Sequence, residues 1–319
     1  GSEMCIRDRD CRVMTRRSYI DRRALFASGA AAALLAASGV SAGSLPRRGG
    51  RLRMALSGAS REDVFDPRAF GSFAESHSSG LFMQVAMAGV LFETLTEVAA
   101  DGTLRGELAT AWRSNEDATM WEFSLREDVS FHNGAPFTSA DVTRLAIHAN
   151  AHEILDTVER VVVAGEHKVR FDLHTADRHL PFKLANPQLC ILPHADVDIA
   201  MQQGIGTGPY RLRKFDAGRH LIADRVDRHH KDGQAAWFDV VELVGIASDE
   251  VRAEALRDHY VDVADLTHMA DVGDVEGLTA LPRDGFMNCA VDNCVALPSQ
   301  IGEAWPLDNL RAPQRWWMA

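Results

Sequence analysis

The sequence WEFSLREDVSFHNGAPFTSADV, at positions 121–142, contains a strand, a turn and a helix start in direct succession. Trp121 to Leu125 alternates large apolar and polar side chains, which is the pattern of a strand with one buried face. The Asn-Gly pair at 133–134 is a turn signal. A helix is expected to begin just after it, with Thr138 or Ser139 as its cap.

Further strands and helices are expected on both sides of this stretch, because the apolar residues change between a period of two and helical spacing. Short polar turns separate two pairs of strands, which predicts two hairpins. The expected strands are 51–57, 158–163, 169–173, 210–215, 220–225, 238–246 and 261–264, and the expected helices lie within 80–98 and from Ser248 to His259. This mixture predicts the α/β class with a mixed α+β subdomain, without a repeat or a low-complexity tract.

The composition is that of a soluble globular protein, with 46% hydrophobic and 25% charged residues. Net charge is distributed unevenly along the chain. Residues 1–42 contain seven arginines and four acidic residues, so they carry a net charge of +3. The net charge of the whole chain is -11, and the rest of the chain therefore carries -14. A strongly acidic body excludes a nucleic-acid partner, since phosphate backbones require a basic surface.

Residues 14–42 have the features of an export signal. A basic segment is followed by an uncharged run of Ala, Leu, Gly and Ser that ends in a small-x-small cleavage site at Ala42. The pair Arg22-Arg23 resembles a twin-arginine signal. The alternative is a membrane anchor, but the Ala-rich composition and the cleavage site favour a cleaved signal. Residues 1–13 are interpreted as a non-native leader.

The chain has five cysteines, two of which lie before residue 14. The remaining three are an odd number, so no complete disulfide framework is predicted. Cys289 and Cys294 could pair in an exported protein, or could be two small side chains in or beside a strand.

Three blocks of sequence, in order, carry a resemblance to a known family. The first block is the stretch at 121–142 together with four motifs that precede it, Leu91-Phe92-Glu93-Thr94-Leu95-Thr96, Asp101-Gly102-Thr103, Leu108-Ala109 and Ala111-Trp112. The second block is Gly206-Thr207-Gly208-Pro209-Tyr210. The third is Glu254-Ala255-Leu256, which leads to Val261-Asp262-Val263-Ala264. Together they resemble the extracytoplasmic solute-binding proteins of family 5, which serve dipeptide, oligopeptide and nickel importers. The resemblance covers about residues 51–290 and is specific for the family rather than for one substrate.

The resemblance implies a periplasmic-binding-protein-like fold of type II, with two lobes that close on a ligand. Family members are longer than this chain, so it resembles lobe one with a stub of lobe two, truncated at its C-terminal end. The implied parts are the start of lobe one at 43–73, an inserted subdomain at 74–185, the core of lobe one at 186–288 and the start of lobe two at 289–319.

The implied function is that of a periplasmic substrate-binding component of an ABC-type importer. It would capture peptides without catalysis, as a monomer without a cofactor, and deliver them to the permease and ATPase complex. Nickel chelates, opines and sugars are alternative ligands. Peptides can bind by pairing their main chain like an added strand. The ligand-binding positions implied by the resemblance are Gly71, Ser72, Phe73, Met287, Asn288 and Cys289.

Residues 204–208, with three glycines, superficially suggest a nucleotide-binding loop. A dinucleotide fingerprint needs a helix after it, whereas Pro209 and a strand follow here. A tight turn near the hinge, with close backbone approach, is the preferred interpretation. His132, in the opening stretch, is interpreted as a structural residue beside a turn.

Two pairs of histidines could bind metal. His148 and His152 are four residues apart on an expected helix, which leaves a periplasmic metal-dependent hydrolase or metal-binding protein as the alternative function. However, no general-base Glu lies between them, as a metalloprotease would require. His229-His230 is interpreted as part of a solvated loop. No catalytic constellation and no metal site are therefore assigned.

Overall fold

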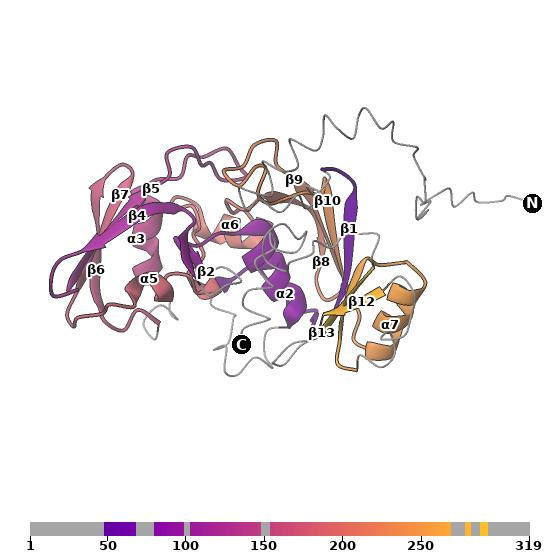
Figure 1. Cartoon of the computed structure of the whole chain (residues 1–319). Coiled ribbons are helices and arrows are strands. Elements are labelled where there is room, and N and C mark those ends of the chain that lie inside the picture. Colours follow the sequence, from indigo (N-terminus) through magenta and orange to yellow (C-terminus); the bar gives the residue numbers. More distant parts are fainter. Residues whose placement is uncertain are drawn as a thin grey trace, which may run out of the picture. The chain divides into compact units, whose positions relative to one another are not determined.

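The computed structural model describes residues 48–67, 80–98, 103–147, 154–268, 278–281 and 288–292, all within one compact unit, Pro46–Ala319. Two main sheets form this part of the chain, and we call them the large sheet and the small sheet (Figure 1). The large sheet has the strand order β12 (Leu278–Leu281), β13 (Asn288–Asp292), β11 (Val263–Leu266), β1 (Arg51–Leu56), β10 (Val240–Gly245), β9 (His220–Arg225) and β8 (Tyr210–Asp216).

Strand β1 lies at the centre of the large sheet and pairs in parallel with both of its neighbours. Arg51 is opposite Val240 of β10, and Met54 is opposite Val263 of β11. The other strand pairs of this sheet are antiparallel. Figure 1 shows β1, drawn in indigo, beside the orange strands that come much later in the chain. The large sheet therefore depends on pairing between distant parts of the sequence.

Helical segments cover both faces of the large sheet. The first face packs against α2 (Leu81–Val85) and the π-helix η3 (Ala86–Leu91), which share one buried cluster with alternate residues of β1. The opposite face packs against α7 (Asp249–Arg257). The expected cap of α7 is confirmed, because the Ser248 hydroxyl accepts a hydrogen bond from the Val251 N–H.

The small sheet is antiparallel throughout and has a hydrophobic cluster of its own. In β5 and β7, buried residues alternate with partly exposed ones, as the sequence predicts for Trp121 to Leu125. The buried face packs against a short helical segment whose capping box at Thr138 confirms the expected helix start. The elements are β4 (Ala109–Ser114), β5 (Met120–Leu125), β7 (Lys168–Leu173) and β6 (Val158–Gly165), with α3 (Ser139–Thr143) and the 3-10 helix η4 (Arg144–Ile147).

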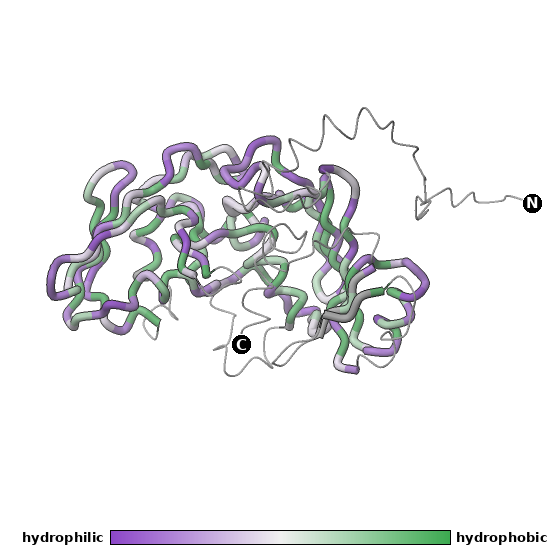
Figure 2. Tube along the Cα trace, viewed as in Figure 1, coloured by the Kyte–Doolittle hydropathy of each residue, from purple (hydrophilic) through white to green (hydrophobic). Residues whose placement is uncertain are grey.

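Shorter elements connect the two sheets. Figure 2 shows hydrophobic and hydrophilic residues alternating along the strands, with hydrophilic residues frequent in the peripheral loops. Most of these short segments carry too little periodic signal to be predicted from the sequence. They are β2 (Thr96–Val98), β3 (Leu104–Gly106), α5 (Leu180–Lys183), the 3-10 helix η5 (Pro187–Leu189) and α6 (Val197–Gln203).

Both expected hairpins are confirmed, as β6–β7 and β8–β9. Strand β11 starts at Val263 rather than at residue 261. The reason is local: the Asp262 carboxylate accepts the Arg53 N–H at 2.8 Å, so a side chain supplies the acceptor there. No helix in the described segments is both long and apolar enough to cross a bilayer.

Candidate functional site

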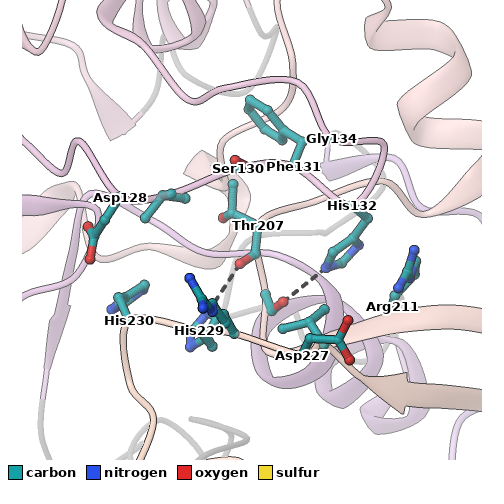
Figure 3. Close-up of a pocket in the computed structure, with 14 residues that line it drawn as sticks. Asp128, Ser130, Phe131, His132, Gly134, Thr207, Arg211, Asp227, His229 and His230 are labelled. Atoms are coloured by element: carbon teal, nitrogen blue, oxygen red, sulfur yellow. Dashed lines mark hydrogen bonds between the residues drawn. The ribbon is translucent and has the colours of Figure 1, made fainter.

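A cavity of about 250 Å³ lies where three chain segments meet (Figure 3). The first segment, 128–134, follows β5. The second, 207–211, leads into β8, and the third, 226–230, follows β9. Each segment comes directly after or before a strand of one of the two sheets. The cavity therefore lies at the junction between the small sheet and the large sheet.

His132 fixes the first segment to the second. Its backbone N–H donates to the Gly206 carbonyl at 2.9 Å, and its Nδ1 accepts the Gly206 N–H at 3.3 Å. With Nδ1 as an acceptor, Nε2 carries the proton and donates to the Gly208 carbonyl at 2.9 Å. Burial lowers the pKa of His132, which agrees with this neutral form. The structural role expected for His132 is confirmed.

The glycines of the second segment are required by a close approach to the end of η3. A Cβ on Gly206 would lie 2.1 Å from the Leu91 carbonyl oxygen, and one on Gly208 would lie 2.5 Å from that of Val90. The Gly208 N–H donates to the Leu91 carbonyl at 2.9 Å. These contacts confirm the expected close backbone approach, and they place the Thr207 side chain in the cavity wall.

The side chains of Glu93, His229 and His230 converge beside the cavity, whose lining includes both histidines. Their exposed fractions are 0%, 5% and 1%. Nε2 of His230 lies 2.8 Å from Glu93 Oε1, and Nε2 of His229 lies 3.4 Å from the same oxygen. The imidazole centroids are 4.3 Å apart. Burial alone would raise the pKa of Glu93, but the two imidazoles outweigh it and hold the pKa well below its ordinary value.

Lys231 continues this polar cluster beside the buried histidines. Its Nζ donates to Glu97 Oε2 at 2.6 Å and to Glu107 Oε1 at 2.9 Å. Glu107 is fully buried, and its other oxygen accepts the Thr94 N–H and hydroxyl. The three residues at 229–231 therefore attach the segment after β9 to acidic residues in and beside β2 and β3.

The earlier interpretation of His229-His230 as a solvated loop is wrong. Both rings are buried because they pair with a buried carboxylate. One signal in the sequence was available: Glu93 lies in an apolar run, where an ionised side chain needs a buried partner. Nothing in the sequence indicates that the partner lies at positions 229 and 230.

The arrangement can bind polar groups. The cavity is lined by side chains of both charges, among them Asp128, Arg211 and Asp227. Cys190, the one cysteine whose side chain the structure describes, is buried. Burial raises the pKa of its thiol to about 12, so it is not a nucleophile at neutral pH.

Most of the ligand-binding positions expected from the resemblance lie outside the described residues. This holds for Gly71, Ser72, Phe73 and Met287, and also for the metal candidates His148 and His152 and for Cys294. Asn288 and Cys289 are in β13, with their backbones paired with Leu266 and Asp265 of β11. The structure does not bring these two residues to the cavity described above, whose lining comes from other segments.

Comparison with known proteins identifies relatives of this chain. Residues 103–284 match the family model of bacterial extracellular solute-binding proteins, family 5 Middle. The probable D,D-dipeptide-binding periplasmic protein DdpA of Escherichia coli is 25% identical over 241 residues, covering 70% of this chain and 44% of that protein. The nickel-binding periplasmic protein of Escherichia coli is 29% identical over 159 residues, covering 46% and 30%.

Among solved structures, the PBP AgaA of A. tumefaciens R10, in complex with agropinic acid, superposes with a TM-score of 0.65 at 22% identity. The match covers 74% of this chain and 48% of AgaA. It confirms the expected binding-protein fold for the matched part. The chain spans less than half the length of each of these relatives.

Proposed function

The chain belongs to the bacterial extracellular solute-binding proteins of family 5, and from this membership we propose that it is the peptide-capturing component of an ABC-type importer. The observation that carries the proposal is the family match, which extends through 103–284 and so includes the small sheet and most of the large one. The relatives are binding proteins by name, so the proposed role is capture without catalysis.

Peptides are the proposed ligand class because the relative that aligns with 70% of this chain is named for a dipeptide. The nickel-binding relative aligns with 46% of it. AgaA, which binds agropinic acid, supports the fold without bearing on the ligand, since its identity is only 22%. Nickel chelates and opines are therefore treated as competing ligands that the experiment must discriminate.

Capture is proposed to use main-chain groups more than particular side chains. A peptide that pairs like an added strand needs exposed N–H and C=O groups, with pockets for its side chains. The segment at 71–73 is proposed to supply these groups. Residues 287–289 are proposed as another wall of the site, because the backbone of Cys289 is already paired with β11 and β12 in the large sheet. A periplasmic location, a permease and ATPase as partners, and the lobe boundaries expected from the sequence are proposed from the family. A signal peptide cleaved near Ala42 is proposed from the composition of residues 14–42.

Calorimetric titration of the purified 319-residue chain tests the ligand class. The ligands are a dipeptide series that includes a D,D-dipeptide, an oligopeptide, a nickel–histidine complex and agropinic acid. We expect a peptide to bind with a Kd of about 1 μM or tighter. Binding of only the nickel complex or only agropinic acid would overturn the peptide proposal, and so would the absence of any binding.

Two substitutions at one position test the main-chain mode of capture. Ser72→Pro removes a backbone N–H, whereas Ser72→Ala keeps it and removes only the hydroxyl. Loss of one hydrogen bond to the ligand is worth on the order of 1 kcal/mol, so Ser72→Pro is expected to weaken peptide binding about fivefold to tenfold. Ser72→Ala is the matched control and should bind as the unaltered chain does. Equal weakening by both variants contradicts main-chain capture at this loop.

A further inference from the structure

We propose that Glu93, His229 and His230 form a binding site for one divalent transition-metal ion of the zinc type. This site is separate from the ligand-capturing positions proposed above. It uses two imidazole nitrogens and one carboxylate, a donor set that suits zinc and its neighbours in the first transition series. The ligand atoms of the three residues all lie within 4.8 Å of one another.

The distances fit a tetrahedral ion after a small adjustment. With metal–ligand bonds of about 2.0–2.1 Å, the ligands of a tetrahedral site lie about 3.4 Å apart. Nε2 of His229 and Oε1 of Glu93 already have a separation of 3.4 Å. Nε2 of His230 lies closer to that oxygen, at 2.8 Å, which is a hydrogen-bond distance. A metal would replace the proton of this hydrogen bond, and the two atoms would separate by a few tenths of an ångström.

The surroundings of the three side chains provide a second reason for a ligand. Nδ1 of His230 and Oγ1 of Thr207 are buried, and neither has a hydrogen-bond partner within the part of the chain that the structure describes. Both residues also line the cavity, as Figure 3 shows. Buried polar atoms without partners commonly mark an ordered water or ion. The cavity, with its volume of about 250 Å³, has room for a water, which we propose as the fourth ligand.

Metal binding requires a proton rearrangement on each imidazole. In His230, the proton shared with Glu93 Oε1 leaves Nε2 for Nδ1, so that Nε2 can bind the metal. The Lys231 N–H donates to Nδ1 of His229 at 3.2 Å, so the proton of the neutral ring is on Nε2, which faces the Thr207 carbonyl at 3.2 Å. Coordination through Nε2 moves that proton to Nδ1 and opens the bond from Lys231. Both bonds are long for N–H hydrogen bonds, so their loss costs little relative to two metal–ligand bonds.

His220 and Glu242 form a second histidine–glutamate pair, which we compare with the cluster at Glu93. His220 Nε2 lies 2.7 Å from Glu242 Oε1, and Arg51 pairs with the other oxygen of Glu242. That contact has one imidazole and lies on a partly exposed strand. At Glu93, two adjacent imidazoles, tilted by 33° to each other, are directed at the same buried oxygen. The second imidazole distinguishes a chelating site from a simple pair.

The consequence of metal binding would be a cross-link between the segment after η3 and the segment after β9. An ion that binds only the folded chain stabilises it in proportion to its occupancy. Zinc is therefore expected to raise the Tm of the protein without changing the ligand that is captured.

Zinc titration of the chelator-treated, full 319-residue chain tests the site. We expect one Zn²⁺ per chain with a Kd below 1 μM, measured by calorimetry and by metal analysis after gel filtration. His229→Gln and His230→Gln are expected to weaken binding at least 100-fold and to abolish the zinc-dependent rise in Tm. His220→Gln is the matched control and should retain both properties. Wild-type affinity in both cluster variants would show that the zinc is bound elsewhere and would overturn the proposal.

X-ray absorption of the zinc-loaded wild-type chain gives a result that does not depend on the folding of a variant. We expect two imidazoles and one or two oxygen ligands. Thiolate ligands, a single imidazole, or no stoichiometric zinc in the wild-type chain would each overturn the site. Peptide capture is measured in the same preparation, so failure of the metal proposal remains distinguishable from failure of the proposed function.

Discussion

The two sheets of this protein are organised by different physical principles. The small sheet pairs segments that are close in the chain, and its two central strands bury every second residue. The large sheet has β1 at its centre, paired in parallel with strands from much later in the sequence. Its neighbour β11 is buried at all four positions, so it has no alternating face.

The difference extends to the groups that hold each sheet together. The small sheet has a cluster of aromatic rings, in which Phe123 and Phe171 have centroids 5.4 Å apart. The large sheet uses buried charges at strand ends: the Asp265 carboxylate accepts from Ser57, and Arg252 donates to the Asp265 carbonyl. Loss of an aromatic ring is therefore expected to be the costly change in the small sheet, and loss of one partner of a buried ionic contact a costly change in the large sheet.

The largest effect is expected from Phe123→Ala in the small sheet. The ring is fully buried and packs against Phe171 and Trp121. Removing a buried Phe ring typically lowers the free energy of unfolding by about 4 kcal/mol, measured by urea denaturation. Hydrogen exchange should show a greater loss of protection in β5 and β7 than in β1.

Phe182→Ala provides the control for this prediction, because its side chain is 49% exposed. Its cost should stay within about 0.5 kcal/mol. Equal loss of protection in β1 and β5 after Phe123→Ala would contradict the separation of the two sheets and show one cooperative core.

A smaller effect is expected from Arg252→Met in the large sheet. Arg252 is 3% exposed and donates to the carbonyls of Ile246, Ala247 and Asp265 at 2.7–3.0 Å. Methionine keeps much of the apolar volume but leaves these acceptors and the Asp265 carboxylate without their cation. Such a change lowers the free energy of unfolding by about 3 kcal/mol, measurable by urea denaturation.

Arg113→Met is the comparison for the small sheet. Arg113 also pairs with a carboxylate, that of Glu122 at 2.8 Å, but its side chain is 77% exposed. An exposed pair contributes about 0–1 kcal/mol, so this variant should unfold almost as the unaltered chain does. If Arg252→Met has an equally small effect, buried ionic groups do not hold the large sheet together.

The same difference explains which parts of the fold could be predicted from the sequence. The strand at Trp121 to Leu125, the turn at 133–134 and the β6–β7 hairpin rest on local patterns, and the structure contains them. The parallel pairing of β1 with β10 and β11 depends on distant residues, and no local pattern indicates it. The short helix α6 was missed because its seven residues give too little periodic signal.

The site could be predicted only in part. The roles of His132 and of the glycines at 206 and 208 followed from turn chemistry and close approach. The burial of His229 and His230 could not be predicted, because it depends on Glu93, more than a hundred positions earlier in the chain. A charged residue in an apolar run signals that a partner exists, but only the tertiary structure identifies it.

The smallest effects are expected from two aspartates whose pKa values change in opposite directions. Burial raises the pKa of Asp265, in the large sheet, above its ordinary value of 3.8. Burial also acts to raise the pKa of Asp172, in the small sheet, but hydrogen bonds from Arg160 and Arg170 outweigh it and lower the pKa below 3.8. The two sheets therefore contain carboxylates with opposite pH dependence.

Urea denaturation of Asp265→Asn and Asp172→Asn across the acidic range tests this contrast. Above pH 3.8, up to its raised pKa, folded Asp265 binds more protons than it does in the unfolded chain, so its contribution to stability falls as the pH rises. Below pH 3.8, folded Asp172 binds fewer protons, so its contribution is lost as the pH falls through its lowered pKa. The stability difference between the unaltered chain and each variant should therefore shrink with rising pH for Asp265→Asn and with falling pH for Asp172→Asn. Slopes of the same sign would mean that the Asp265 carboxylate is stabilised by Ser57 and Arg252 more strongly than burial disfavours its charge.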